Sequence, residues 1–312
     1  MIQSLSITWN HEGAFHLGPI TLRLYSLMFV VAFGLGWIIM KKIFDRENEP
    51  VEKLDKLFIY TLVATLLGAR LGHVFFYDCA YFSQHPEEIL LPFKFNPFEF
   101  TGFAGLASHG AAIAIILAVI WYSKKIIHRP VLWVLDRVVI PVTSGGIFVR
   151  LGNFFNSEIL GSETSPKLAT AVRFVRGENT LGKREAMKIT SQADPNKAYE
   201  MIENDPLFAD TLASIPFRHP AQLYEAVCYV FVFLIIFYMY WKTPARKYHG
   251  LIFGVFLVLL WAVRFVVEFV KESQGGFEGK DPILLTGQWL SIPFILAGFY
   301  LIFTAKKRIE TL

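Results

Sequence analysis

The sequence predicts an all-α polytopic membrane protein with seven transmembrane helices, a small extracytoplasmic head, the N-terminus outside and the C-terminus in the cytosol. Of its 312 residues, 54% are hydrophobic and only 18% are charged, and the mean hydropathy is +0.44. Soluble domains carry about a quarter charged residues, and a soluble chain of this length would need more polar side chains to cover its surface. The excess apolar area is therefore expected to face lipid.

Apolar runs give the predicted spans. A helix needs about 17 to 25 apolar residues to cross the hydrocarbon layer, and such runs predict spans at 22–40, 57–77, 102–121, 131–149, 222–241, 250–269 and 288–303. No Lys or Arg precedes the first run. The chain start therefore lacks the basic region of a cleaved signal peptide, and the first span is expected to remain in the mature protein.

Basic residues in the short loops predict the orientation, because Lys and Arg concentrate on the cytosolic side. One side carries Lys94, Lys271 and Lys280. The other side carries Lys41, Lys42, Arg46, Lys53, Lys56, Lys124, Lys125, Arg129, Lys242, Arg246, Lys247, Lys306, Lys307 and Arg308. This second set is predicted to lie in the cytosol.

A less hydropathic segment after the fourth span predicts the extracytoplasmic head. Within it, Asp194-Pro195 followed by Tyr199, Met201 and Ile202 indicates a capped amphipathic helix. The predicted organisation is transmembrane helices 1–4 in residues 1–160, the head in 161–217, and helices 5–7 in 218–312.

Polar residues at membrane depth share the predicted outer half of the bilayer. Ionisable groups inside spans cost about 2.5 to 3.5 kcal/mol each at a helix centre, which makes them functional candidates. Mapped onto the topology, the outer group comprises Arg23, Tyr25, Arg70, His73, His109, Arg150, Asn153, Asn156, Glu158, His219, Gln222, Tyr224, Glu225, Arg264, Glu268 and Gln288. The cytosolic halves are mostly apolar, with Asp136 and Arg137 as the main exception.

Three arginines in this outer half, Arg70, Arg150 and Arg264, indicate an anion site, because guanidinium favours bidentate recognition of phosphate or carboxylate. Each arginine near a span end has a simpler explanation, since its side chain could snorkel to the interface. Arg264 and Glu268 could form an i,i+4 pair within one helix. Arg150, Asn153 and Asn156 would share one face if their helix continues past the predicted span.

The stretch Arg150-Leu151-Gly152-Asn153-Phe154-Phe155-Asn156-Ser157-Glu158-Ile159-Leu160-Gly161 resembles the signature of bacterial prolipoprotein diacylglyceryl transferases. Further segments resemble the same family in the same order. They are Arg23–Met28, Gly68–Gly72, Ser108–Gly110, His219–Glu225, Arg264–Glu268 and Gly287–Ser291. Val149, Ala111 and Lys271 depart from the residues expected of the family, and Lys271 stands where a further arginine is expected. The segment 161–217 has no motif that aligns.

The resemblance implies an enzyme of the bacterial inner membrane that moves the diacylglyceryl group of phosphatidylglycerol onto the lipobox cysteine of a prolipoprotein signal peptide, forming a thioether and releasing glycerol phosphate. It implies no cofactor and no metal. Catalytic roles are expected for His109, as the base that ionises the thiol, and for Arg150 and Arg264, as the phosphate-binding cations. Substrate-binding roles are expected for Tyr25, Arg70, Asn153, Asn156, Glu158, Gly161, Gln222, Tyr224 and Glu268.

Other classes remain as alternatives or are excluded. A transporter of anionic lipid or organic anions would also place arginines at membrane depth, but it would need polar access from both sides. His109 could simply bond neighbouring helices, and Glu158 could pair with an arginine. The net charge of +4 shows no basic stripe, so a nucleic-acid partner is not expected. Cys79 and Cys228 fit neither a zinc site nor a disulfide framework, and no protease motif is found.

Overall fold

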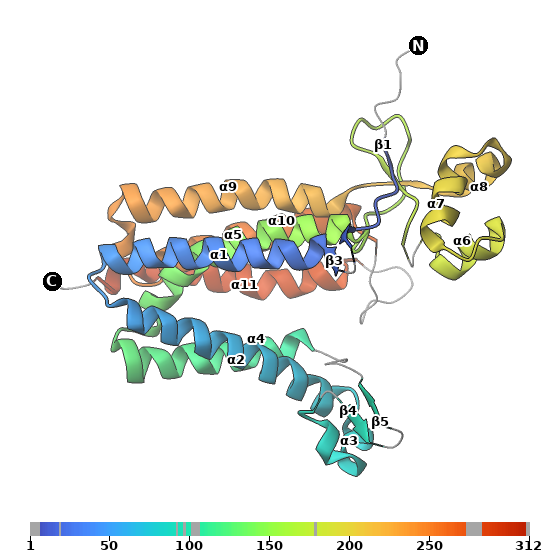
Figure 1. The fold of residues 1–312 in the computed structure, drawn as a ribbon. Coiled ribbons are helices and arrows are strands. Elements are labelled where there is room, and N and C mark those ends of the chain that lie inside the picture. The colour runs from blue at the N-terminus through green and yellow to red at the C-terminus, as the bar shows by residue number, and fades with distance from the viewer. Residues whose placement is uncertain are drawn as a thin grey trace. The chain divides into compact units, whose positions relative to one another are not determined.

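The computed structural model describes residues 7–18, 20–91, 93–95, 98–100, 107–177, 180–272 and 283–309. Within these ranges, seven helices are long and apolar enough to cross a membrane, which confirms the predicted number (Figure 1). They are α1 (Leu24–Arg46), α2 (Val51–Phe76), α4 (Ser108–Tyr122, continued by the π-helical turn Ser123–Ile127), α5 (Val131–Phe155), α9 (Ala221–Lys242), α10 (Leu251–Val267, continued by the 3-10 turn Glu268–Val270) and α11 (Thr286–Thr304). The chain is an all-α multi-pass membrane protein.

Several helices extend beyond the apolar runs that predicted them. Helix α1 runs to Arg46 and α2 starts at Val51, because backbone hydrogen bonding continues through charged residues that no apolar window includes. Helix α5 passes the predicted end at 149 and reaches Phe155. For the predicted span 102–121, the first residues lie outside the described residues, and α4 begins at Ser108.

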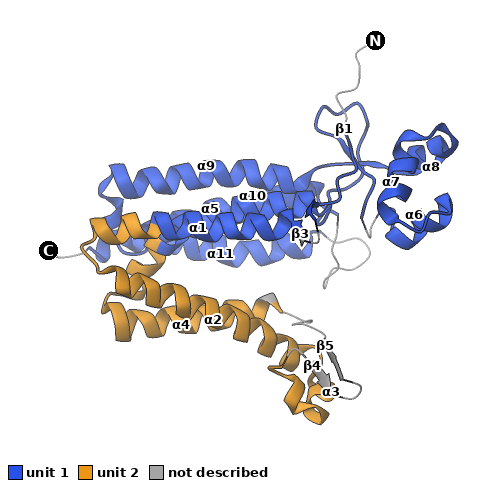
Figure 2. Ribbon diagram, viewed as in Figure 1, with its two compact units in different colours: residues 1–39, 138–312 blue, residues 40–137 orange. Residues whose placement is uncertain are grey.

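The chain forms two compact units (Figure 2). Unit 1 contains Met1–Ile39 and Val138–Leu312, and unit 2 contains Met40–Arg137. These units group residues by contact, whereas the predicted division at residues 160 and 217 followed the order of the spans. Each unit is described on its own below.

In unit 1, the segment 161–217 folds around a small core together with the start of the chain. Strand β6 (Val172–Phe174) pairs in parallel with β1 (Ile7–Trp9) and antiparallel with β7 (Phe217–Arg218). Helices α6 (Lys183–Thr190), α7 (Pro195–Asn204) and α8 (Ala209–Ser214) follow. Nearby, β2 (Ala14–Leu17) and β3 (Ile20–Arg23) form an antiparallel hairpin that leads into α1.

Helix α7 confirms the amphipathic helix predicted in this segment. The Asp194 carboxylate accepts a hydrogen bond from the backbone N–H of Asn196 at 2.9 Å, as an N-cap residue does. Its inner face buries Tyr199 and Ile202 in a core that also contains Val175, Leu181, Ala186, Ala198 and Ile215.

Unit 2 is organised by close packing of α2 on α4. A Cβ atom added to Gly72 would lie 2.6 Å from the Cα of Gly110, so the two backbones approach without room for a side chain. Gly68 and Gly72 form the small-xxx-small spacing that permits such contacts between membrane helices. After α2 come α3 (Cys79–Gln84) and the antiparallel strands β4 (Phe93–Phe95) and β5 (Phe98–Phe100).

Cys79 of unit 2 and Cys228 of unit 1 are both free thiols.

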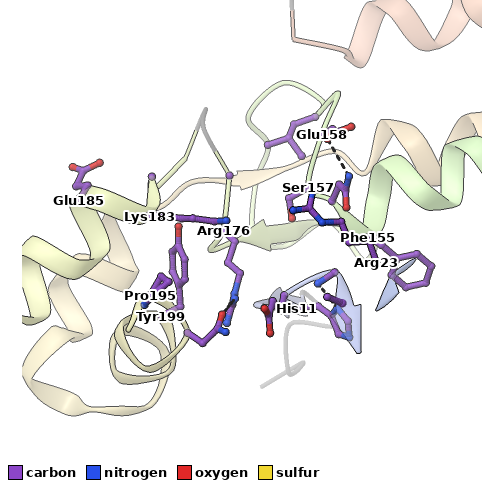
Figure 3. A pocket seen from close by; sticks show the side chains of 18 of the residues that line it. His11, Arg23, Phe155, Ser157, Glu158, Arg176, Lys183, Glu185, Pro195 and Tyr199 are labelled. Atoms are coloured by element: carbon purple, nitrogen blue, oxygen red, sulfur yellow. Dashed lines mark hydrogen bonds between the residues drawn. The ribbon is translucent and has the colours of Figure 1, made fainter. Parts of the chain in front are cut away.

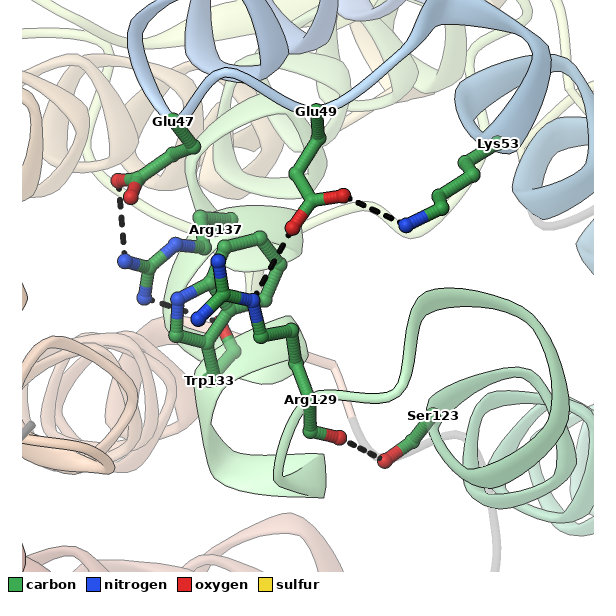
Figure 4. A network of polar contacts seen from close by, with 7 residues as sticks. All are labelled: Glu47, Glu49, Lys53, Ser123, Arg129, Trp133 and Arg137. Carbon is green, nitrogen blue, oxygen red and sulfur yellow. Dashed lines mark hydrogen bonds and ion pairs between the residues drawn. The ribbon is translucent and has the colours of Figure 1, made fainter.

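Ion pairs join the turn between α1 and α2 to the start of α5 in unit 2 (Figure 4). Glu47 accepts from Arg137 at 2.9 Å, and Glu49 pairs with Arg129 at 3.0 Å and with Lys53 at 2.8 Å. The Arg137 guanidinium also stacks 3.9 Å from the centre of the Trp133 ring. Arg137, which the sequence singled out as an exception in a cytosolic half-span, is thus part of a structural network.

Candidate active site

The predicted site residues of unit 1 gather where four of its membrane helices end or begin. Arg150 and Asn153 lie in the last turns of α5, Gln222 and Glu225 in the first turns of α9, and Arg264 in the last turn of α10. Helix α11 adds its first turn, where the Glu268 carboxylate packs directly against Gly287. Because successive spans alternate in direction, these ends meet at one membrane face.

A buried ion cluster forms the centre of this group. The Glu225 carboxylate is 2.7 Å from Nε of Arg150 and 3.6 Å from Nζ of Lys271, and its side chain is only 1% exposed. Lys271 Nζ is also 3.9 Å from the Glu268 carboxylate. Burial lowers the pKa of the Lys271 ammonium, while the neighbouring Glu225 carboxylate favours its charged form. An uncompensated charge at this depth would be costly, so the cluster must be assembled from both signs.

Arg264 differs from the other two cations. Among the described residues, no carboxylate pairs with Arg264, and its buried Nε has no hydrogen-bond acceptor. Its guanidinium lies 5.2 Å from the centre of the Trp261 ring, while its charge acts on Lys271 and Tyr229. The intrahelical pair with Glu268 that the sequence allowed is not formed, because Glu268 lies beside Lys271 and Gly287. Arg264 therefore has donors to offer to an added anion.

Amide groups extend the cluster toward the turn after α5. Arg150 donates to Oδ1 of Asn153 at 3.5 Å, and Asn153 donates in turn to the Glu158 carboxylate at 3.3 Å. Asn156 donates to the same carboxylate at 3.1 Å, and Gln222 donates to the backbone oxygen of Glu158. Glu158 thus accepts from amides rather than from an arginine. The predicted helical stripe includes Arg150 and Asn153 but not Asn156, which follows the end of α5.

Gly161 lies at a crossing of three backbone segments. Its N–H donates to the backbone oxygen of His219 at 3.0 Å, and it forms an isolated β-bridge with Lys271. A Cβ atom at this position would meet the His219 backbone oxygen, would lie 2.6 Å from the His219 Cβ and would lie 2.7 Å from the Val270 backbone oxygen. A side chain here would separate the α5, α9 and α10 ends, so the geometry supports a packing role for Gly161.

Replacement of Gly161 by alanine is expected to destabilise the protein by about 1 to 3 kcal/mol, the usual cost of overpacking, because two of the obstructing atoms are backbone oxygens. The geometry of the ion cluster should change with it, since Lys271 would be displaced. Thermal unfolding of the purified variant measures the effect. Gly34→Ala is the matched control, because a Cβ atom there meets nothing within 4 Å. An unchanged melting temperature for Gly161→Ala would contradict the packing role.

Two predicted tyrosines lie at the border of the cluster. The Tyr25 ring packs against Gly152, where an added Cβ would be 2.8 Å away, and its phenol is within electrostatic range of Glu158 and Arg150. The Tyr224 hydroxyl is 2.6 Å from Oγ1 of Thr170 and 3.3 Å from Nδ1 of His219. Tyr25 is therefore next to the ion cluster, whereas Tyr224 bonds to the segment 161–217.

Arg70 and His109 belong to unit 2. Arg70 is buried and donates to the backbone oxygens of Ile89 at 2.7 Å and Glu88 at 2.8 Å, with its guanidinium 4.8 Å from the centre of the Phe82 ring. These bonds hold the loop after α3. His109 is exposed in the first turn of α4, directly before the packed Gly110. Both residues keep their predicted roles as proposals.

Two members of the cluster had no assigned role in the sequence analysis. Glu225 was noted among the polar residues at membrane depth, and its burial beside Arg150 was the missing information. Lys271 was noted among the few basic residues of the outer side and as a departure from the family. Its position three residues after Glu268 could have suggested a shared cluster, but the contact with Glu225 joins residues far apart in sequence.

The chain was compared with known proteins. A family model described as prolipoprotein diacylglyceryl transferase matches residues 12–304. The chain is 36% identical over 311 residues to a phosphatidylglycerol–prolipoprotein diacylglyceryl transferase of Chloroherpeton thalassium, covering 99% of this chain and 98% of the relative. It is 34% identical over 301 residues to the protein of that name in Tolumonas auensis, covering 96% and 98%, and 36% identical over 314 residues to that of Porphyromonas gingivalis, covering 97% and 95%. The chain belongs to the prolipoprotein diacylglyceryl transferase family.

Proposed function

We propose that this enzyme transfers the diacylglyceryl group of phosphatidylglycerol to the lipobox cysteine of prolipoproteins, with its active site at the outer face of the bacterial inner membrane. The relatives' shared name and their near full-length alignment support this reaction. One observation of the structure supports this proposal most strongly. Arg264 brings a guanidinium, with no carboxylate partner among the residues that the structure describes, to a cluster that already balances Arg150 and Lys271 with two carboxylates.

The reaction is a substitution at carbon. The cysteine sulfur attacks the glyceryl carbon that carries the phosphodiester, a C–S bond forms, and the C–O bond to the phosphate breaks. The electron pair leaves with glycerol phosphate, and a base takes the proton of the thiol. A free thiol is mostly protonated at neutral pH, so the step needs this base or a cationic field.

The cations act on the leaving group. Arg264 and Arg150 bind the phosphate and stabilise the charge that builds on it, a contribution that is largest in a site poor in water. Glu225 is a positioning residue, because its contact with Nε fixes the Arg150 guanidinium, and the terminal nitrogens keep N–H groups beyond the one that Asn153 accepts. Asn153, Asn156 and Glu158 orient the glycerol headgroup. The base is His109 of unit 2, a role that follows from the family resemblance of Ser108–Gly110.

The orientation follows from the charge bias, and tags can check it. Reporters near Lys125 and Lys307 are expected to be inaccessible from outside intact spheroplasts, whereas one at Lys188 in α6 should be accessible, because Lys and Arg concentrate in cytosolic loops. Labelling by a membrane-impermeant reagent measures this. A cytosolic Lys188 would contradict an active site at the outer face.

The function itself is tested with purified protein in detergent, phosphatidylglycerol and a cysteine-bearing lipobox peptide. The expected result is a mass increase of the peptide by one diacylglyceryl group. Two matched controls should abolish this mass increase. One replaces phosphatidylglycerol by phosphatidylethanolamine, and the other replaces the peptide's cysteine by serine. If the peptide stays unmodified while the protein in vesicles moves anionic lipid between leaflets, the transporter alternative is correct instead.

A further inference from the structure

Unit 1 contains a cavity of about 910 Å³ beside the turn that follows α5 (Figure 3). Its walls come from residues 11–14, Thr21 and Arg23 of the hairpin region, the turn 155–160 after α5, and residues 176–177, 182–185, 195–196 and Tyr199 of the segment 161–217. This volume is at the upper end of the roughly 300 to 1,000 Å³ that ligand sites commonly occupy. It is large enough for several residues of an extended chain.

The cavity borders the candidate active site. Asn156 and Glu158 line its wall, and the same two side chains hydrogen-bond to each other and, through Asn153, connect to Arg150. The Asn153 side chain therefore links the wall of the cavity to Arg150 in the predicted phosphate site. The far wall is α6 and α7, on the side of the site away from the membrane helices.

The polar lining mixes both charge signs. Lys183, Arg184 and Glu185 are exposed in the first turn of α6 and line the cavity. Arg176 is held by neutral partners, donating to the side-chain oxygens of Asn10 and Asn196 at 2.6 Å each, and packs on the Tyr199 ring. Charged and amide groups of this kind suit a polar polypeptide, whereas acyl chains would require an apolar lining.

From this placement we infer that the cavity binds the polypeptide that follows the lipobox cysteine, so that the first residues of the mature lipoprotein leave the active site along α6. The inference rests on the proposed function and adds the path of the protein substrate. A cysteine at the membrane surface is followed by exported chain, which must pass out of the site on the side away from the bilayer. Lys183 and Arg184 then favour acidic side chains in the residues after the cysteine.

The test is steady-state transfer with two lipobox peptides, one ending directly after the cysteine and one continuing for six residues that include two aspartates. With the long peptide, the double variant Lys183→Glu/Arg184→Glu is expected to raise KM by about 3- to 10-fold, as the loss of two exposed ion pairs predicts. For the short peptide, the KM of the double variant should equal that of the wild type. For a long peptide with two lysines in place of the aspartates, the double variant should have a lower KM than the wild type. Lys188→Glu/Lys197→Glu is the matched control, because it makes the same charge change on exposed residues of α6 and α7 outside the cavity.

A photo-reactive side chain placed three residues after the cysteine gives an independent readout, with crosslinks expected in residues 176–199. The inference is overturned if KM changes equally for both peptide lengths, if the control variant has the same effect, or if the variant alters KM for phosphatidylglycerol instead. Absence of transfer by the wild-type protein would refute the proposed function, and this result is distinct from transfer that is indifferent to the cavity.

Discussion

Replacement of Arg150 by lysine is expected to lower the rate of diacylglyceryl transfer by about 10²- to 10³-fold, the usual loss when one preorganised donor to a developing charge is removed. Arg150 uses Nε on Glu225 and a terminal nitrogen on Asn153, which leaves further N–H groups for a phosphate. An ammonium keeps the charge but has no planar fork, so it cannot hold Glu225 and the phosphate in the same geometry. The loss should therefore appear mainly in kcat.

Arg46→Lys is the control for this variant, because Arg46 lies in the last turn of α1, at the helix end remote from Tyr25. Its rate should equal that of the wild type, and the thermal unfolding of both variants should confirm that they are folded. If lysine at position 150 supports wild-type transfer, then Arg150 is an interfacial anchor and the phosphate assignment is wrong.

Replacement of His109 by asparagine is expected to cut turnover by about 10²- to 10⁴-fold while lipid binding survives, the range that general-base catalysis contributes. A base accepts a proton only when it is itself unprotonated. General-base catalysis therefore predicts an acidic limb in the pH profile of wild-type transfer, and the variant should lose this limb. A pH profile of transfer, with phosphatidylglycerol binding measured in parallel, separates this role from a structural one.

His128→Asn is the matched control in the same unit. His128 is exposed and has a left-handed backbone with φ of 56°, a conformation that asparagine tolerates. It should retain both the rate and the pH profile. If His109→Asn stays within about threefold of wild type with the acidic limb intact, the base is Glu158, or the arginines alone ionise the thiol.

Apolar length was sufficient to predict the number of membrane helices, because this signal is local to each span. It was not sufficient to predict where the helices end. Helix α5 continues past its apolar run to Phe155, and this extension is what places Asn153 beside Arg150. Asn156 falls beyond the helix end, so a periodicity that assumes an unbroken helix gave one residue too many on that face.

In the candidate site, too, contacts between residues close in sequence could be predicted, and contacts between residues far apart in sequence could not. Arg150 and Asn153 are three residues apart on one helix, so their bond could be anticipated from spacing, whereas the sequence left the partner of Glu158 open. The partners that set the charge balance of the cluster could not be anticipated from spacing. Glu225 joins Arg150 to Lys271 across three separate helix ends, and Arg264 is left without Glu268 because Gly287 brings α11 against that carboxylate. Such pairings depend on packing between helices and have no signature in one sequence.

The central claim is that the glyceryl carbon, and not the phosphate, is transferred. It is tested most directly with phosphatidylglycerol carrying one isotope in the diacylglyceryl part and another at phosphorus, incubated with the purified protein and a lipobox peptide. The account predicts that the diacylglyceryl isotope appears on the cysteine as a thioether, and that an equal amount of the phosphorus isotope appears as water-soluble glycerol phosphate. Phosphorus on the peptide, or unchanged lipid moved across a vesicle with neither product formed, would contradict it.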